Sequence, residues 1–172
     1  MFGQAGELEI MGNYSCRLVA YLTAKRGLTK MTTKPVIEAA TKEESEYIRR
    51  RLIEYNAQHV PEHLRNRYEE INLTVKDEDG RVVGGMLAEF CWNWIEVHIL
   101  WVDDAVRRSG YGSKLLQQIE TIAREKECNF LKLNTFSFQA PEFYKKKGYR
   151  EIAVLEDAPS GSRHYYFKKD IV

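Results

Sequence analysis

The chain contains a short turn whose residues are suited to binding an anion: Arg107-Arg108-Ser109-Gly110-Tyr111-Gly112-Ser113. Small residues let backbone N–H groups approach an anion closely, and the N-terminus of the helix expected to follow adds a partial positive charge. Two common phosphate motifs do not fit, because Leu115 replaces the third glycine of a dinucleotide fingerprint and the Gly-Lys-Ser/Thr of a Walker loop is missing. The alternative is a plain tight turn between a strand and a helix.

Two ionisable residues, Glu96 and His98, lie two positions apart in the stretch IEVHILWV that precedes this turn. Because side chains alternate along a strand, they are predicted to share one face, with Ile95, Val97 and Ile99 on the other. Two ionisable side chains on one face of a central strand are unusual for a pure core. Either could accept a proton from an amine through water, and a rim-exposed pair or a salt bridge to Lys or Arg is the alternative.

The composition of the 172 residues is that of an ordinary globular protein, with a net charge of +1. This balance argues against nucleic acid or a membrane surface as a partner, and the Lys145–Lys147 run is predicted to be a solvated helix end. No apolar run is long enough to span a bilayer. The cysteines, at positions 16, 91 and 128, form no C-x-x-C pair. This spacing disfavours a metal site and a disulfide framework, and it fits the reducing cytoplasm.

Hydrophobic periodicity predicts the element order β-α-α-β-β-β-α-β-α-β-β. Thr41 and Glu44 form a capping box before the first helix, and Asp79-Gly80 is a strong hairpin signal. The second helix, at 61–70, could equally be a loop. Strands are expected at 35–40, around 71–75, and at 81–91, 95–102, 128–136, 149–156 and 162–169, with helices at 41–58, after Gly112 and at 140–148.

The stretch Arg107-Arg108-Ser109-Gly110-Tyr111-Gly112 resembles the Gln/Arg-x-x-Gly-x-Gly/Ala signature of the GNAT superfamily of N-acyltransferases, and FYKKKGY at 143–149 is similar to a second segment of that family. The resemblance covers about residues 36–170. It implies an α/β (α+β) fold: a mixed, mostly antiparallel sheet with helices on both faces, splayed between its fourth and fifth strands. We expect the acetyltransferase domain at 35–172, after an N-terminal extension at 1–34.

The resemblance also implies an activity: transfer of an acetyl group from acetyl-CoA to a primary amine by direct attack in a ternary complex, without a metal. It implies Tyr144 as general acid, with a core aromatic as the alternative, and Glu96 as base. His98, on the same predicted strand face, is a candidate base or partner. Ser137 stands where many members of the family have an asparagine, and nearby Asn134 could supply a related hydrogen bond, so both are candidate coenzyme contacts. The implied coenzyme contacts are Leu100, Trp101 and Val102 for the pantetheine, and Arg107, Arg108, Ser109, Gly110, Tyr111, Gly112 and Ser113 for the pyrophosphate.

The acceptor stays open among polyamines or antibiotics, a protein amine and an amino-acid-like metabolite. Residues near the first two helices could receive a cationic amine, although they could equally be surface residues: Glu54, Tyr55, Glu62, Tyr68 and Glu69. A non-catalytic acyl-CoA-binding or sensing module is the alternative function. The closing strands at 149–156 and 162–169 are rich in β-forming residues and could leave an unpaired edge, which predicts a homodimer.

Overall fold

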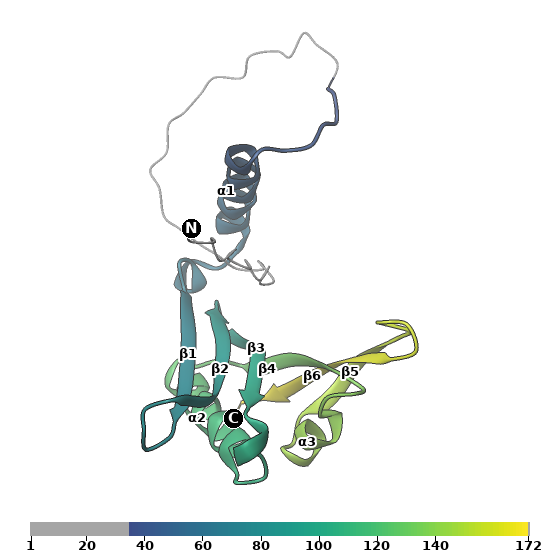
Figure 1. Ribbon diagram of the computed structural model, residues 1–172. Helices are drawn as coiled ribbons and strands as arrows, with labels where there is room; N and C mark the ends of the chain where they lie inside the picture. Colours follow the sequence, from purple (N-terminus) through teal and green to yellow (C-terminus); the bar gives the residue numbers. More distant parts are fainter. Residues whose placement is uncertain (1–34, 172) are drawn as a thin grey trace, which may run out of the picture. The chain divides into compact units, whose positions relative to one another are not determined.

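The computed structural model describes residues 35–171, which form two units (Figure 1). The first, residues 35–67, contains helix α1 (Lys42–His59) and the 3₁₀ helix η1 (Glu62–Leu64). The second, residues 68–171, contains the sheet and the remaining helices. The extension predicted at residues 1–34 lies outside the described residues.

Helix α1 begins as the sequence predicts. The Thr41 hydroxyl accepts a hydrogen bond from the backbone N–H of Glu44 at 3.2 Å, and the Glu44 carboxylate accepts one from the N–H of Thr41 at 2.8 Å. The strand predicted at 35–40 is wrong, because these residues have no regular structure and Val36 and Ile37 are exposed. A strand needs a neighbour to pair its backbone groups, and none of the described strands pairs with this segment.

The sheet has six strands in the order β1-β2-β3-β4-β6-β5, and only β3 and β4 are parallel neighbours. The predicted mixed, mostly antiparallel sheet is therefore confirmed. Helix α2 (Tyr111–Glu125) connects the parallel pair, after the 3₁₀ helix η2 (Asp104–Val106), and α3 (Pro141–Lys146) connects β4 to β5. The strands are β1 (Tyr68–Lys76), β2 (Val82–Cys91), β3 (Trp94–Val102), β4 (Phe130–Phe136), β5 (Arg150–Glu156) and β6 (Arg163–Asp170).

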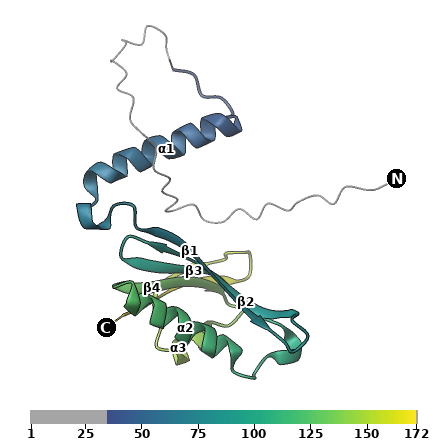
Figure 2. The same ribbon diagram turned by 90° about the vertical axis from the view of Figure 1, so that its left-hand side faces the viewer.

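The core of this unit lies between the sheet and α2, and α2 and α3 lie on the same side of the sheet in both views (Figures 1 and 2). Apolar residues of α2 recur at helical spacing and are buried against the inward residues of β3 and β4. The largest fully buried side chains include Phe167, Met86, Ile95, Leu116, Ile119 and Leu131. This packing fixes the strands from which the site described below is built.

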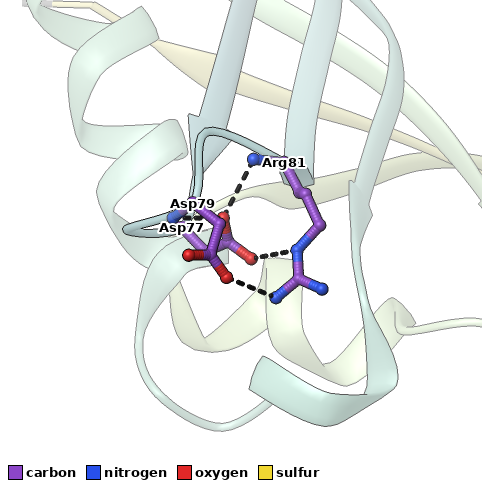
Figure 3. A network of polar contacts seen from close by, with 3 residues as sticks. All are labelled: Asp77, Asp79 and Arg81. Atoms are coloured by element: carbon purple, nitrogen blue, oxygen red, sulfur yellow. Dashed lines mark hydrogen bonds and ion pairs between the residues drawn. The ribbon is translucent and has the colours of Figure 1, made fainter.

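The turn between β1 and β2 forms where Asp79-Gly80 predicts it (Figure 3). The Asp77 carboxylate accepts hydrogen bonds from the backbone N–H groups of Asp79 and Arg81 at 3.0 and 2.9 Å. The Arg81 guanidinium donates to both aspartates, at 2.9 and 3.1 Å. Gly80 has a φ of +79°, which an L residue with a side chain rarely adopts. Local contacts alone therefore specify this hairpin.

Strand β3 contains a β-bulge at His98. Val97 is paired with Ala88 and Ile99 with Leu87, so His98 has no partner of its own on β2. The extra residue shifts the alternation of side chains along the strand. Leu100 and Val102 consequently pack on the core, whereas Ile99 is 39% exposed, and the prediction that Ile99 shares a face with Ile95 and Val97 is wrong.

The remaining features concern the edge of the sheet, a cysteine and the length of the helices. Strand β6 lies between β4 and β5, so of the two closing strands only β5 is at an edge. Cys128 is buried, between α2 and β4 in the sequence. No helix in the described part of the chain is both long and apolar enough to cross a membrane.

Candidate active site

A cleft opens where β3 and β4 separate. The two strands are paired only from Trp94–Val97 to Phe130–Leu133, and beyond this point their facing backbone edges diverge. The cleft has a volume of about 530 Å³ and is lined by β3 residues 97–102, β4 residues 133–135, Arg107, residues 138–140, and Phe143 and Tyr144 of α3. The predicted splay between these two strands is therefore present.

The glycine turn forms the N-terminus of α2. Gly110 is the N-cap residue, with a φ of +88°, and no side chain caps the first turn. The first N–H groups of the helix, in Tyr111, Gly112 and Ser113, have no acceptor within the helix itself. A Cβ on Gly110 would have no atom within 4 Å, whereas one on Gly112 would lie 3.4 Å from the Phe143 ring. The turn thus offers open space and N–H donors beside the cleft, as an anion requires.

The two arginines of the turn differ in position. The Arg107 guanidinium donates to the carbonyl of Val102 at 3.0 Å and forms an ion pair with Asp104, and Arg107 lines the cleft. Arg108 is exposed, does not line the cleft and has a φ of +67°, an uncommon conformation for a residue with a side chain. Ser109 is likewise exposed. The charge that borders the cleft is therefore that of Arg107.

Tyr144 is on the α3 side of the cleft. It is 7% exposed, and burial raises the pKa of its hydroxyl to about 12. Its ring packs against Phe143, Tyr149 and Phe167, with centroids 5.2 to 6.1 Å apart. The hydroxyl thus stays protonated at neutral pH and can donate a proton inside the cleft.

The predicted bases Glu96 and His98 are in different surroundings. His98 lines the cleft, and its Nε2 lies 3.4 Å from a carboxylate oxygen of Glu89. Glu96 does not line the cleft, and its carboxylate forms an ion pair with Lys132 at 2.7 Å. The side chains of Glu89 and His98 are each 17% exposed, so their interaction is partly shielded from water. The geometry therefore favours His98 over Glu96 as the group that meets a substrate.

Asn134 and Ser137 were predicted to contact the coenzyme from the β4 side. Asn134 lines the cleft, and its side-chain oxygen lies 2.9 Å from Nε2 of His164. Ser137 does not line the cleft, because its hydroxyl accepts a hydrogen bond from the backbone of Arg163 at 3.1 Å. Of these two residues, only Asn134 is placed to meet a ligand there.

The residues that the sequence analysis suggested for the acceptor amine belong to both units. Glu54, Tyr55 and Glu62 belong to the first unit, where Glu54 forms an ion pair with Arg51. Tyr68 and Glu69 begin β1, and Glu69 forms an ion pair with Lys126. Their role in binding an amine stays a prediction.

The sequence analysis missed three residues of this region: Glu89, Phe138 and His164. A signal for Glu89 was present, because counting back from the Trp92-Asn93 turn places it opposite Glu96 in an antiparallel pair. Phe138 lines the cleft but stands in a loop without periodicity. His164 meets Asn134 only through the pairing of β4 with β6.

The glycine turn, the splayed strands and Tyr144 together are the features that the GNAT resemblance implies. The profile of the Acetyltransferase (GNAT) family matches residues 36–149. The chain belongs to the GNAT acetyltransferase family. Among the described residues of this acetyltransferase, no three His, Cys, Asp or Glu side chains are grouped so that they could hold a metal ion.

Two named GNAT acetyltransferases show how far the similarity extends. Blasticidin-S acetyltransferase from Streptomyces morookaense is 38% identical over 95 residues, which cover 55% of this chain and 70% of that protein. An acetyltransferase from Agrobacterium fabrum is 28% identical over 132 residues, 77% of this chain and 94% of that protein. The similarity to the second relative therefore spans almost its whole length.

Solved GNAT structures agree with this fold. The crystal structure of an acetyltransferase from Bacillus cereus ATCC 14579 is 45% identical, with a TM-score of 0.76, and covers 79% of this chain and 97% of that chain. An acetyltransferase from Bacillus anthracis str. Ames, crystallised with acetyl coenzyme A, is 20% identical, with a TM-score of 0.55 and coverage of 66% and 69%. The second likeness concerns the fold alone.

Proposed function

We propose that this acetyltransferase transfers the acetyl group of acetyl-CoA to a primary amine by direct attack in a ternary complex. The observation that carries the proposal is the cleft between β3 and β4. It brings a protonated tyrosine, Tyr144, and an imidazole, His98, into one space, and it is bordered by Arg107 just before the uncapped start of α2.

The coenzyme fits the residues of this region. The free N–H groups of residues 110–113 would hold its pyrophosphate, and Arg107 would add a positive charge, with the backbone of Arg108 and Ser109 at the edge of the turn. The pantetheine would lie along Leu100–Val102, whose edge toward β4 is unpaired. Backbone groups exposed there can pair with amides of the ligand as a neighbouring strand would.

Each step then has a group to carry it. His98 accepts a proton from the amine, and the Glu89 carboxylate stabilises the imidazolium that forms. The neutral amine nitrogen then attacks the thioester carbon, and the nitrogen of the tetrahedral intermediate releases its extra proton to water. The carbon–sulfur bond breaks, and its electron pair goes to the sulfur. Tyr144 gives its proton to the departing sulfur and regains one from solvent. No cysteine in the described part of the chain lines the cleft, which supports direct attack over an acetylated enzyme.

The acceptor we propose is a small molecule rather than a protein amine. The support is the relative named for blasticidin-S, a small molecule, which is 38% identical over 95 residues. A cationic amine would be attracted by the Glu89 carboxylate, which lies 3.4 Å from Nε2 of the cleft residue His98.

Release of free CoA from acetyl-CoA with a panel of primary amines tests the proposal. We expect release that depends on the amine, together with a mass gain of one acetyl group on that amine. Initial velocities with both substrates varied should give intersecting lines, as a ternary complex requires. Parallel lines would instead indicate an acetylated enzyme, and an absence of release with every amine would contradict acetyl transfer to amines.

A further inference from the structure

Four aromatic rings form a continuous row across the end of β4 and the start of β6. Phe138 stacks on Phe136, with centroids 5.2 Å apart and planes at 8°. Phe136 stacks on His164 at 4.3 Å, and His164 lies against Tyr166 at 4.6 Å. Phe136 and His164 are direct partners in the pairing of β4 with β6, so the sheet itself fixes the inner part of the row.

Hydrogen bonds hold the imidazole of this row in one orientation. Nε2 of His164 lies 2.9 Å from the side-chain oxygen of Asn134, and Nδ1 lies 3.4 Å from the hydroxyl of Tyr166. Because the amide oxygen can only accept, Nε2 donates to it. Both ring nitrogens thus have partners that fix the orientation of the ring, and the chemistry proposed above does not use His164.

Phe138 ends the row inside the cleft. Its side chain is 65% exposed although it is fully apolar, and one face of its ring is covered by Phe136. Asn134 lines the cleft beside it, and because the amide oxygen is held by His164, the amide nitrogen remains to donate a hydrogen bond. A ring with one face stacked and the other open, next to a donor, suits a planar ligand that has an acceptor atom.

The coenzyme contacts assigned above do not include Phe138, and this inference moves Asn134 from the coenzyme to the acceptor. The coenzyme is assigned to β3 and the start of α2, whereas Phe138 follows β4 on the other side of the cleft. Phe138 and His98 line the same cleft of about 530 Å³, so one small molecule can contact both.

We infer that the acceptor amine carries a planar, conjugated ring, which stacks on Phe138 as the next member of the row. The inference rests on the proposed acetyl transfer and names the class of amine that the same cleft receives. Its ring would lie over Phe138, its amine would reach toward His98, and the Asn134 amide would donate to an acceptor atom where the ring carries one.

A pair of amines that differ only in the planarity of the ring tests this: 2-phenylethylamine and 2-cyclohexylethylamine. Acetylation of both is measured at saturating acetyl-CoA for the wild type, Phe138→Leu and Phe138→Trp. Phe130→Leu is the matched control, because Phe130 is on the same strand and stacks on Trp94 but does not line the cleft.

We expect the wild type to favour the planar amine by about three- to tenfold in kcat/KM, which is the usual contribution of an aromatic pair. Phe138→Leu should bring the ratio to about one through KM. Phe138→Trp and Phe130→Leu should keep the wild-type ratio. Equal kcat/KM for both amines in the wild type, or an unchanged ratio in Phe138→Leu, overturns the ring site and leaves acetyl transfer standing. If Phe138→Leu raises the KM for acetyl-CoA and leaves the kcat/KM ratio of the two amines unchanged, Phe138 contacts the coenzyme and the ring site is likewise overturned.

Calorimetry separates failure of the ring site from failure of acetyl transfer. If neither amine is acetylated, each is titrated into the protein with CoA bound. If 2-phenylethylamine binds the wild type more tightly than Phe138→Leu, the ring site is supported and the proposed acetyl transfer is what has failed. Absence of binding by either amine overturns the ring site.

Discussion

Tyr144→Phe separates the proposed acid from a core aromatic. The change keeps the ring, with its contacts to Phe143 and Phe167, and removes only the hydroxyl that would protonate the departing sulfur. General acid catalysis contributes about 10² to 10⁴ in rate, which corresponds to roughly 3 to 5 kcal/mol of barrier. We therefore expect kcat to fall by about that factor, and the dissociation constant for acetyl-CoA to stay within a few-fold.

The structure also sets the expected stability of the variant. The Tyr144 hydroxyl makes no hydrogen bond with another described residue, although the side chain is 7% exposed. Its removal therefore costs no protein hydrogen bond, and the free energy of unfolding should stay within about 1 kcal/mol of the wild type. Thermal unfolding of both proteins measures this, and a large loss of stability would give the hydroxyl a structural role.

The pH dependence provides a second check. Burial raises the pKa of Tyr144 to about 12, so its proton is present throughout the range in which the enzyme can be assayed. The loss of rate in Tyr144→Phe should thus be the same at pH 6 as at pH 9. Because the folded protein holds this proton more tightly than the unfolded chain, the associated stability is full below about pH 10 and is lost as the pH rises toward 12.

Tyr149→Phe is the matched control. Tyr149 is 2% exposed, its ring centroid lies 6.0 Å from that of Tyr144, and it does not line the cleft. Its kcat should stay within about threefold of the wild type. Rates are measured by release of CoA thiol and by single-turnover quench, which shows whether chemistry limits the rate. Full kcat in Tyr144→Phe with chemistry rate-limiting, or an equal loss in Tyr149→Phe, would refute the assignment of the acid.

Three further predictions concern the base, the anion site and assembly. Glu89→Gln should lower kcat about tenfold because it removes the charge beside His98. Glu96→Gln should change kcat less than threefold, because the Glu96 carboxylate of the wild type pairs with Lys132. Equal effects of the two variants would contradict the assignment of Glu89 as the carboxylate that supports catalysis. Gly110→Glu should weaken CoA binding at least tenfold in calorimetry because it adds negative charge where the phosphates would lie. The control Gly110→Ala should keep the affinity for CoA within a few-fold and lower the free energy of unfolding by about 1 to 2 kcal/mol, because the residue has a φ of +88°. Unchanged CoA affinity in Gly110→Glu would rule out the turn as the anion site. If β5 forms the predicted homodimer through its edge, Ile152→Lys should give a monomer by light scattering, and a wild type that is itself monomeric at working concentration would exclude the dimer.

Several features of this protein follow from neighbouring residues and could be predicted from the sequence. The capping box of Thr41 and Glu44 and the hairpin at Asp79-Gly80 each involve groups within a few positions of one another. The glycine turn before α2 is equally local, because Gly110 supplies a conformation that other residues rarely adopt. The two motifs that resembled GNAT proteins likewise lie in contiguous stretches.

Other features depend on pairing between distant segments, and the sequence did not indicate them. The apolar run at 35–40 has the pattern of a strand but no described strand beside it. The bulge at His98 arises only from the register of β2 with β3, and it moves Ile99 off the core face. A pattern of alternating apolar and polar residues does not reveal such an insertion. One extra residue moves every later side chain of the strand to the opposite face of the sheet.

The choice among candidate site residues was decided by tertiary structure for the same reason. The resemblance implied Glu96 as the base ahead of His98, but the parallel pairing of β3 with β4 places Lys132 against the Glu96 carboxylate. Glu89 reaches His98 from the neighbouring strand, and His164 meets Asn134 across 30 positions of chain. Residue type and spacing thus determined the glycine turn and the family, whereas the partners of each ionisable group were set by strand register, which long-range packing fixes.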